Sequence, residues 1–125
     1  MAQQLPEFAQ LGHGTPPVRR LGLATRGNTH LTTDDVLYAI NRGINYLNWC
    51  AHPDGMSYAI RQLSADQRKK IVVAMQFSSS SADEARRELD ETLHELDTDY
   101  IDVITFYYVE HESEWEEIAG EAGAL

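Results

Sequence analysis

Apolar and polar positions change their spacing from block to block along this chain. Residues 71–75, "IVVAM", form a continuous apolar run that is typical of a strand covered on both faces. Residues 44–50 and 99–109 are rich in β-branched and aromatic side chains, which favour strands. Within residues 8–25, the stretch 12–17 contains two glycines and two prolines, which favour a turn between two strands. The pattern predicts a strand, a turn and a further strand, "VRRLGLAT" (18–25), followed by three more strands.

Helical spacing separates these strands. Val36, Ala39 and Ile40 form one apolar stripe at helical spacing. Thr32 precedes this stripe, and Asp35 stands three residues later, which is the pattern of a capping box. Gly43 follows the stripe and predicts the end of the helix there.

Further helices are expected in the second half of the chain. Ser81 and Glu84 make a second capping box, ahead of a long helix. Its predicted buried stripe consists of Ala85, Leu89, Thr92, Leu93 and Leu96. Short helices are predicted at residues 56–64 and 112–120.

The order of these elements predicts an α/β fold with parallel strands. Successive strands begin about 25–30 residues apart, which is the length of a βαβ unit. An open doubly wound sheet and one half of a (βα)8 barrel are both compatible with this periodicity. Residues 1–125 are expected to form a single domain, with the hairpin and first strand at 8–25 and the remaining βα units at 26–120.

Composition narrows the classes of partner. The formal net charge of −10 argues against nucleic acid and anionic membrane surfaces, which require basic residues. Residues 110–121 carry part of this excess, and they are either a solvated helix face or an acidic interaction tail. No apolar run approaches the roughly 20 residues of a membrane helix, and no signal peptide is expected. The single cysteine, Cys50, suits a reducing compartment, so a cytoplasmic location is predicted.

Four segments in order resemble the amino-terminal half of the aldo-keto reductases. They are "VRRLGLAT" (18–25), "TTDDVLYAINRGINYLNWC" (32–50), "KKIVVAMQ" (69–76) and "LDETLHELDTDYIDVITFYYVE" (89–110). The Gly-Ile-Asn turn at residues 43–45 and the segment from Leu89 to Val103 carry most of the specificity. The resemblance implies a (βα)4 half of a TIM-type (βα)8 barrel with an amino-terminal β-hairpin. It also implies reduction of carbonyl compounds with NADPH.

In that family a tyrosine donates the proton, assisted by an aspartate, a lysine and a histidine at the carboxyl ends of the strands. Such a phenol needs a neighbouring cation or a hydrogen-bond relay to act near neutral pH. The resemblance places the aspartate at Asn48 and the lysine at Gln76. It places the histidine at Tyr107 and, with a one-residue insertion, the tyrosine at Asp54. All four identities differ, yet every replacement is polar.

The cofactor implied by the resemblance is NADP. The family holds the phosphates of this cofactor mainly with its carboxyl-terminal half, which is expected to be absent from a chain that stops after the fourth unit. The stretch "GHGTPP" (12–17) is no substitute, because it fits a hairpin turn and lacks the Gly-x-Gly-x-x-Gly pattern.

Several polar side chains follow the predicted second strand. His52 beside Asp54 suits a general base or a metal ligand, or else a solvated loop. Asn48 is either a structural residue of the strand end or a polar member of a site. Cys50 is expected to be inert, because no cation stands near it in the sequence. Trp49 is expected to pack, or to form the floor of a ligand pocket, and Trp115 is also expected to pack.

The end of the fourth strand offers a second group of candidates. Strand alternation predicts that one of Tyr107 and Tyr108 points inward and the other outward. The inward phenol would donate a hydrogen bond or a proton, and the other would pack. Glu110, His111 and Glu112 could join His52 and Asp54 at a metal ion, although their spacing matches no known metal motif.

Two functions remain open at this point. One is a divergent reductase that binds a nicotinamide cofactor. The other is a non-catalytic half-barrel that acts as a scaffold or binds a small ligand. Since a half-barrel leaves two sheet edges unpaired, we expect the chain to form homo-oligomers through them.

Overall fold

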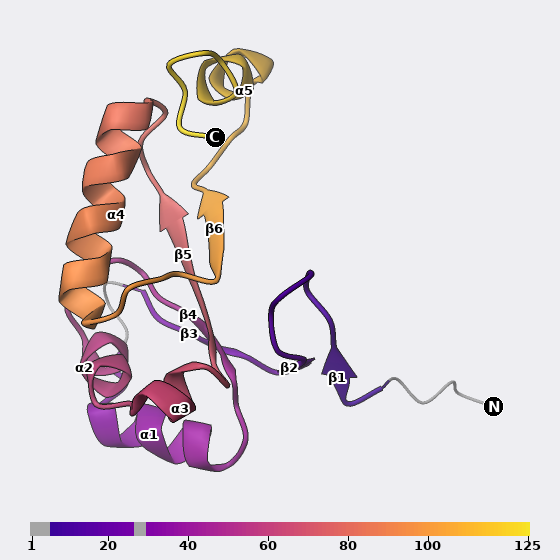
Figure 1. Ribbon diagram of the computed structural model, residues 1–125, viewed down its shortest axis with the longest axis vertical. Helices are drawn as coiled ribbons and strands as arrows, with labels where there is room; N and C mark the ends of the chain where they lie inside the picture. The colour runs from indigo at the N-terminus through magenta and orange to yellow at the C-terminus, as the bar shows by residue number, and fades with distance from the viewer. Residues whose placement is uncertain (1–5, 27–29) are drawn as a thin grey trace.

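Four parallel strands lie side by side in the order in which they occur in the chain. In the computed structural model, which describes residues 6–26 and 30–125, they are β3 (Leu23–Ala24), β4 (Tyr46–Asn48), β5 (Val72–Phe77) and β6 (Val103–Phe106). Their register places Leu23 beside Leu47 and Leu47 beside Val73. Figure 1 shows α1, α2 and α4 on one side of this sheet, whereas α5 lies beyond the carboxyl ends of β5 and β6. The predicted (βα)4 half-barrel with an amino-terminal hairpin is therefore confirmed.

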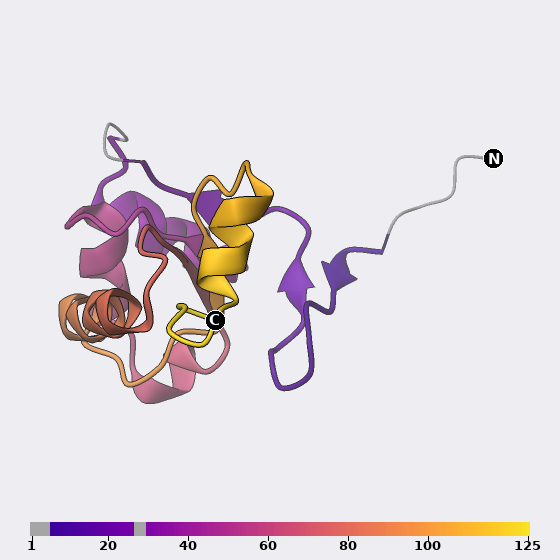
Figure 2. The same cartoon turned by 90° about the horizontal axis from the view of Figure 1, so that it is seen from above.

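The hairpin consists of β1 (Phe8–Ala9) and β2 (Val18–Arg19), which pair antiparallel. The side chain of Asn45, the residue before β4, holds the hairpin there, because Oδ1 accepts a hydrogen bond from the Arg19 amide and Nδ2 donates to the carbonyl oxygen of Pro17. Figure 2 shows the hairpin projecting away from the rest of the molecule.

The predicted strand at 18–25 is divided in two. Val18 and Arg19 pair with β1, whereas Leu23 and Ala24 pair with β4. The chain must turn between these two sheets, and Gly22 lies there against β4. A Cβ atom on Gly22 would lie 2.8 Å from the ring of Tyr46, so the close approach requires glycine.

Side-chain caps define the starts of the helices. The hydroxyl of Thr32 accepts a hydrogen bond from the amide of Asp35 at the start of α1 (Thr33–Asn41), and Ser81 does the same for Glu84 at the start of α4 (Ala82–Leu96). Gly43, with φ +97°, follows α1, as predicted.

The predicted helix at 56–64 corresponds to α2 (Gly55–Arg61), and a second short helix that was not predicted, α3 (Ala65–Arg68), follows it. Ser64 starts α3, because its hydroxyl accepts a hydrogen bond from the amide of Gln67. The sequence prediction missed this cap. The last helix is α5 (Glu112–Ile118), in which Ile118 is buried while the glutamates are exposed or half-buried.

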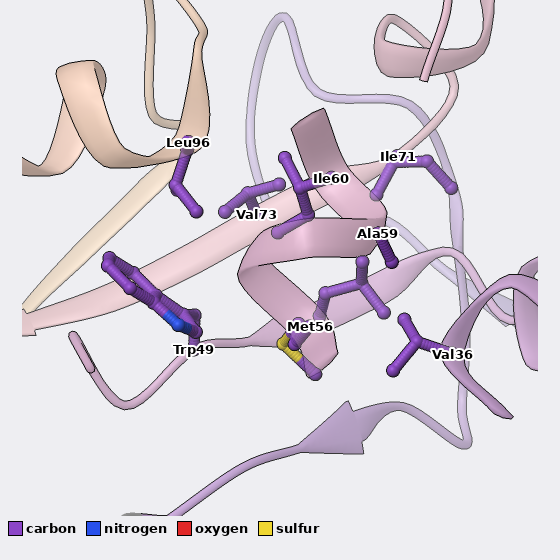
Figure 3. Packing of buried hydrophobic residues seen from close by; sticks show 9 residues of the cluster. Val36, Trp49, Met56, Ala59, Ile60, Ile71, Val73 and Leu96 are labelled. Carbon is purple, nitrogen blue, oxygen red and sulfur yellow. The ribbon is translucent and has the colours of Figure 1, made fainter. Parts of the chain in front are cut away.

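The core lies between the sheet and the helices α1, α2 and α4. Leu47 of β4 belongs to this core. Figure 3 shows Val73 of β5 there together with Val36, Met56 and Leu96. A smaller cluster of Met75, Phe77 and Ala85 continues the core beneath α4. Within the described ranges no helix has the length and apolar character needed to span a membrane.

Candidate functional site

The carboxyl ends of the strands surround a hollow of about 1100 Å³, which we call the strand-end hollow. Parallel α/β folds place their ligand sites at this end of the strands. The residues that line it are Ala24, Thr25, Arg26, Asn48, Trp49, Cys50, Ala51, His52, Pro53, Met75, Gln76, Ser78, Glu88, Glu91, Thr92, Glu95, Tyr107 and Tyr108.

Two neutral amides stand at the strand ends. Asn48 is the last residue of β4 and lies between Ala24 and Ala74 in the register, so its neighbours on both strands are small. Gln76 is the one exposed residue of β5. Side chains alternate along a strand, so Asn48 and Gln76 project from the face opposite to the helix-covered core. The structure therefore brings these two predicted site residues to the same hollow.

Tyr107 and Tyr108 both line the strand-end hollow. Their rings meet edge to face, with centroids 4.7 Å apart and planes at 77°. The side chains are 57% and 68% exposed, so neither packs into the core. The prediction that one tyrosine points inward and the other outward is wrong, because β6 ends at Phe106 and the left-handed backbone of Tyr108 (φ +50°) breaks the alternation.

The loop after β4 is held by Trp49, which is 3% exposed. Its indole Nε1 donates a hydrogen bond of 2.9 Å to the carbonyl oxygen of His52. Trp49 thus packs in the core, as predicted, and also lines the strand-end hollow. The side chain of His52 is exposed and also lines the hollow. Trp115 is 46% exposed, and the prediction that it packs is therefore wrong.

Asp54 has a different position. Its Oδ1 accepts hydrogen bonds of 2.9 Å from the amides of Met56 and Ser57, so it caps α2. Its Oδ2 lies 3.5 Å from the Sγ atom of Cys50. Asp54 is not among the described residues that line the hollow. The structure therefore places Asp54 at the start of α2, two residues after His52.

Carboxylates of α4 form one wall of the hollow, which sequence reasoning missed. They belong to Glu88, Glu91 and Glu95. The spacing of three and four residues places them on one helix face, and that spacing was visible in the sequence. Glu88 accepts hydrogen bonds from the amide and hydroxyl of Ser78, whereas Oε1 of Glu95 is buried and has no hydrogen-bond partner among the described residues.

The acidic segment after β6 is organised around Glu114. Its Oε2 accepts hydrogen bonds from the amides of Glu110 and His111, at 2.9 and 2.8 Å. These two amides lower the pKa of Glu114 below its usual value of 4.5. Among residues 6–26 and 30–125, no three His, Cys, Asp or Glu side chains gather to hold a metal ion.

The chemistry available in the hollow is therefore hydrogen bonding by amides, phenols, carboxylates and one imidazole. Arg26 is the one lysine or arginine among the described residues that line it. Asn48 and Gln76 can donate and accept hydrogen bonds, but they carry no charge and hold no proton for transfer.

Solved structures of aldo-keto reductases share this fold. A Pseudomonas aeruginosa protein assigned to that family matches 90% of this chain with 21% identity and a TM-score of 0.68. An aldo/keto reductase of Brucella melitensis matches 94% with 16% identity and a TM-score of 0.63. A thermostable aldo-keto reductase in complex with the inhibitor epalrestat matches 84% with 21% identity and a TM-score of 0.65.

The chain spans about half the length of these structures, from 44% to 49%. The sequence resemblance to the amino-terminal half of that family is thus confirmed for the fold. No protein-family model and no curated protein matches the sequence.

Proposed function

We propose that this chain binds a small, neutral, hydroxyl-rich ligand in the strand-end hollow and has no carbonyl reductase activity of its own. The observation that carries this proposal is the pair of neutral amides, Asn48 and Gln76, at the strand ends. The resemblance to the reductases puts an acid and an amine at these positions. An amide binds polar ligands well but neither transfers a proton nor supports a charged neighbour.

The other walls of the hollow favour a neutral ligand. The carboxylates of Glu91 and Glu95 would accept hydrogen bonds from hydroxyl groups and repel anions. The exposed rings of Tyr107 and Tyr108 would offer an apolar surface to the C–H groups of the same ligand. A monosaccharide combines these two kinds of group, and it is our model ligand.

A nicotinamide dinucleotide does not fit the residues of this half. Its phosphates need several donors or cations, whereas the described wall holds Glu88, Glu91 and Glu95 against the single guanidinium of Arg26. Binding of NADP was expected from the sequence resemblance alone, and it is not part of this proposal.

Reductase chemistry also lacks a supported proton donor. Of the four positions that the resemblance assigns to catalysis, only Tyr107 carries a phenol, and its ring contacts Tyr108. Asp54, which replaces the family tyrosine, is engaged in capping α2. No proton-transfer step is assigned to either residue.

The ligand is tested by NMR titration of side-chain amides with glucose. We expect the NH2 signals of Asn48 and Gln76 to shift at millimolar glucose. The signal of Gln62 should stay in place, because this amide donates to the carbonyl oxygen of Tyr58 on α2. The double variant Asn48→Leu/Gln76→Leu, checked for folding by circular dichroism, should lose the remaining backbone shifts around the hollow. Unmoved Asn48 and Gln76 signals would reject glucose-type ligands.

The reductase alternative is tested separately with NADPH and benzaldehyde. We expect no enhancement of nicotinamide fluorescence and no consumption of NADPH above the protein-free rate. Consumption that grows with protein concentration and disappears in Tyr107→Phe would overturn the proposal and establish the reductase.

A further inference from the structure

The parallel sheet ends on two strands that have a neighbour on one side only. Among the described residues, β3 pairs with β4 alone and β6 with β5 alone. Tyr107 donates its amide hydrogen to the carbonyl oxygen of Phe77, so with the register of β5 and β6 the alternation of a parallel strand turns the backbone groups of Ile104 and Phe106 toward the open edge. Such edges bind other strands unless something covers them.

The face that bears Asn48 and Gln76 is open at the carboxyl ends of the strands, whereas Val72 and Ala74 on the same face are buried. Ala24, Gln76 and Thr105 are exposed there, although they belong to strands of the central sheet. In a closed barrel this face is the interior. The matched structures are about twice as long as this chain, so it supplies about half of such a fold.

The two edges carry opposite charge. Residues 8–33 contain no aspartate or glutamate, and Arg20 and Arg26 stand at the two ends of β3. Residues 88–125 contain no lysine or arginine, and Asp99 and Glu110 stand at the two ends of β6. All four side chains are exposed.

We infer that a second copy of this chain covers both edges and closes an eight-stranded barrel. A two-fold axis along the barrel sets β3 of each copy beside β6 of the other, and all eight strands then run in the same direction. Because β3 of one copy and β6 of the other run parallel, their amino ends lie side by side and so do their carboxyl ends. Arg20 of one copy therefore lies near Asp99 of the other, and Arg26 lies near Glu110. Both contacts join a basic edge to an acidic one.

The closed dimer completes the strand-end hollow. Asn48, Gln76 and the tyrosine pair of the two copies would line one shared opening, which a single copy leaves open on one side. This inference rests on the edges and their charges and does not require the ligand, so dimer formation and glucose binding are measured independently.

The dimer is tested by light scattering on the wild-type chain. We expect a mass of twice 14.1 kDa. The basic-edge variant Arg20→Glu/Arg26→Glu and the acidic-edge variant Asp99→Lys/Glu110→Lys should each give the mass of a single chain, because each then presents like charges at both contacts. Circular dichroism confirms that each variant is folded.

Mixing the two variants makes the test specific. In an equal mixture, both contacts again join opposite charges, so the dimer mass should return. The matched control is Arg86→Glu/Arg87→Glu on the exposed surface of α4, which changes net charge by the same amount as the basic-edge variant and should keep the dimer. A wild-type mass of 14.1 kDa, or dimers in both edge variants alone, would overturn the inference.

Discussion

Arg68 and Asp102 form a buried ion pair that joins α3 to the start of β6. The Nη1 atom of Arg68 lies 2.8 Å from Oδ2 of Asp102, and the two side chains are 7% and 11% exposed. The same carboxylate oxygen accepts a hydrogen bond from the amide of Val73, and the guanidinium stacks on the ring of Tyr100 at 4.0 Å. One carboxylate therefore fixes the position of β6 against both β5 and α3.

Replacement of Asp102 by alanine should destabilise the protein by about 3–5 kcal/mol, because it leaves the Arg68 guanidinium buried without its counter-charge. Urea unfolding followed by circular dichroism measures the loss. Asp90→Ala, on the exposed side of α4, is the control and should change stability by no more than about 0.5 kcal/mol. If Asp102→Ala and Asp90→Ala lost the same free energy of unfolding, the ion pair would contribute nothing to stability.

Gly55→Ala should destabilise the protein by about 1–3 kcal/mol through overpacking. A Cβ atom at Gly55 would lie 2.2 Å from the carbonyl oxygen of Leu31 and 2.6 Å from the carbonyl carbon of Thr32, and backbone atoms cannot move aside as side chains do. Gly12→Ala is the matched control, since its Cβ would have no atom within 4 Å. Thermal unfolding measures both variants. Equal stability of Gly55→Ala and Gly12→Ala would contradict the close approach of α2 to the start of α1.

Asp54→Ala should cost about 0.5–2 kcal/mol, because the amides of Met56 and Ser57 lose their acceptor. Asp54→Ser should retain most of this stability, since serine is also a good cap. In the glucose titration the signals of Asn48 should still shift in Asp54→Ser. A folded Asp54→Ser protein that no longer responds to glucose would place Asp54 in the site instead.

The carboxyl group of Asp35 should titrate below the usual aspartate value of 3.8. The backbone amide and then the hydroxyl of Thr32 lower its pKa by donating hydrogen bonds to the carboxylate. Because the pKa in the folded state is lowered, the cap contributes its stability above pH 3.8 and loses it as the pH falls through the lowered value. NMR titration of the Asp35 carboxyl carbon measures this pKa.

Thr32→Ala provides the control for this titration. It removes the hydroxyl and keeps the amide, so the pKa of Asp35 should rise only part of the way to its usual value. A wild-type Asp35 that titrates at 3.8 or above would contradict the capping arrangement.

The fold was largely predictable from the sequence because its signals are local. The spacing of Thr32 and Asp35, the apolar run at 71–75 and the glycine at position 43 each act within a few residues, and the structure confirms all three. The division of residues 18–25 was not predictable from this spacing. It depends on two different partner strands, one close in sequence and one more than 20 residues away.

The site was predictable only in part. Asn48, His52, Gln76 and Tyr107 do reach one hollow, because parallel strands end at one edge of the sheet. The wall from α4 was missed because the buried stripe of this helix marks its core face and does not show which neighbouring face reaches the ends of the strands. The orientation of Tyr108 was missed because strand alternation holds only while the strand continues, and β6 stops at Phe106.

The order of the strands in the sheet also governs how the chain folds. Each of β4, β5 and β6 pairs with the strand that precedes it in the sequence, so no pairing has to wait for a distant segment. During synthesis each βα unit can therefore join the sheet as soon as it leaves the ribosome. The amides of β5, which has a neighbour on both sides, should be among the last in the sheet to exchange their hydrogens with solvent.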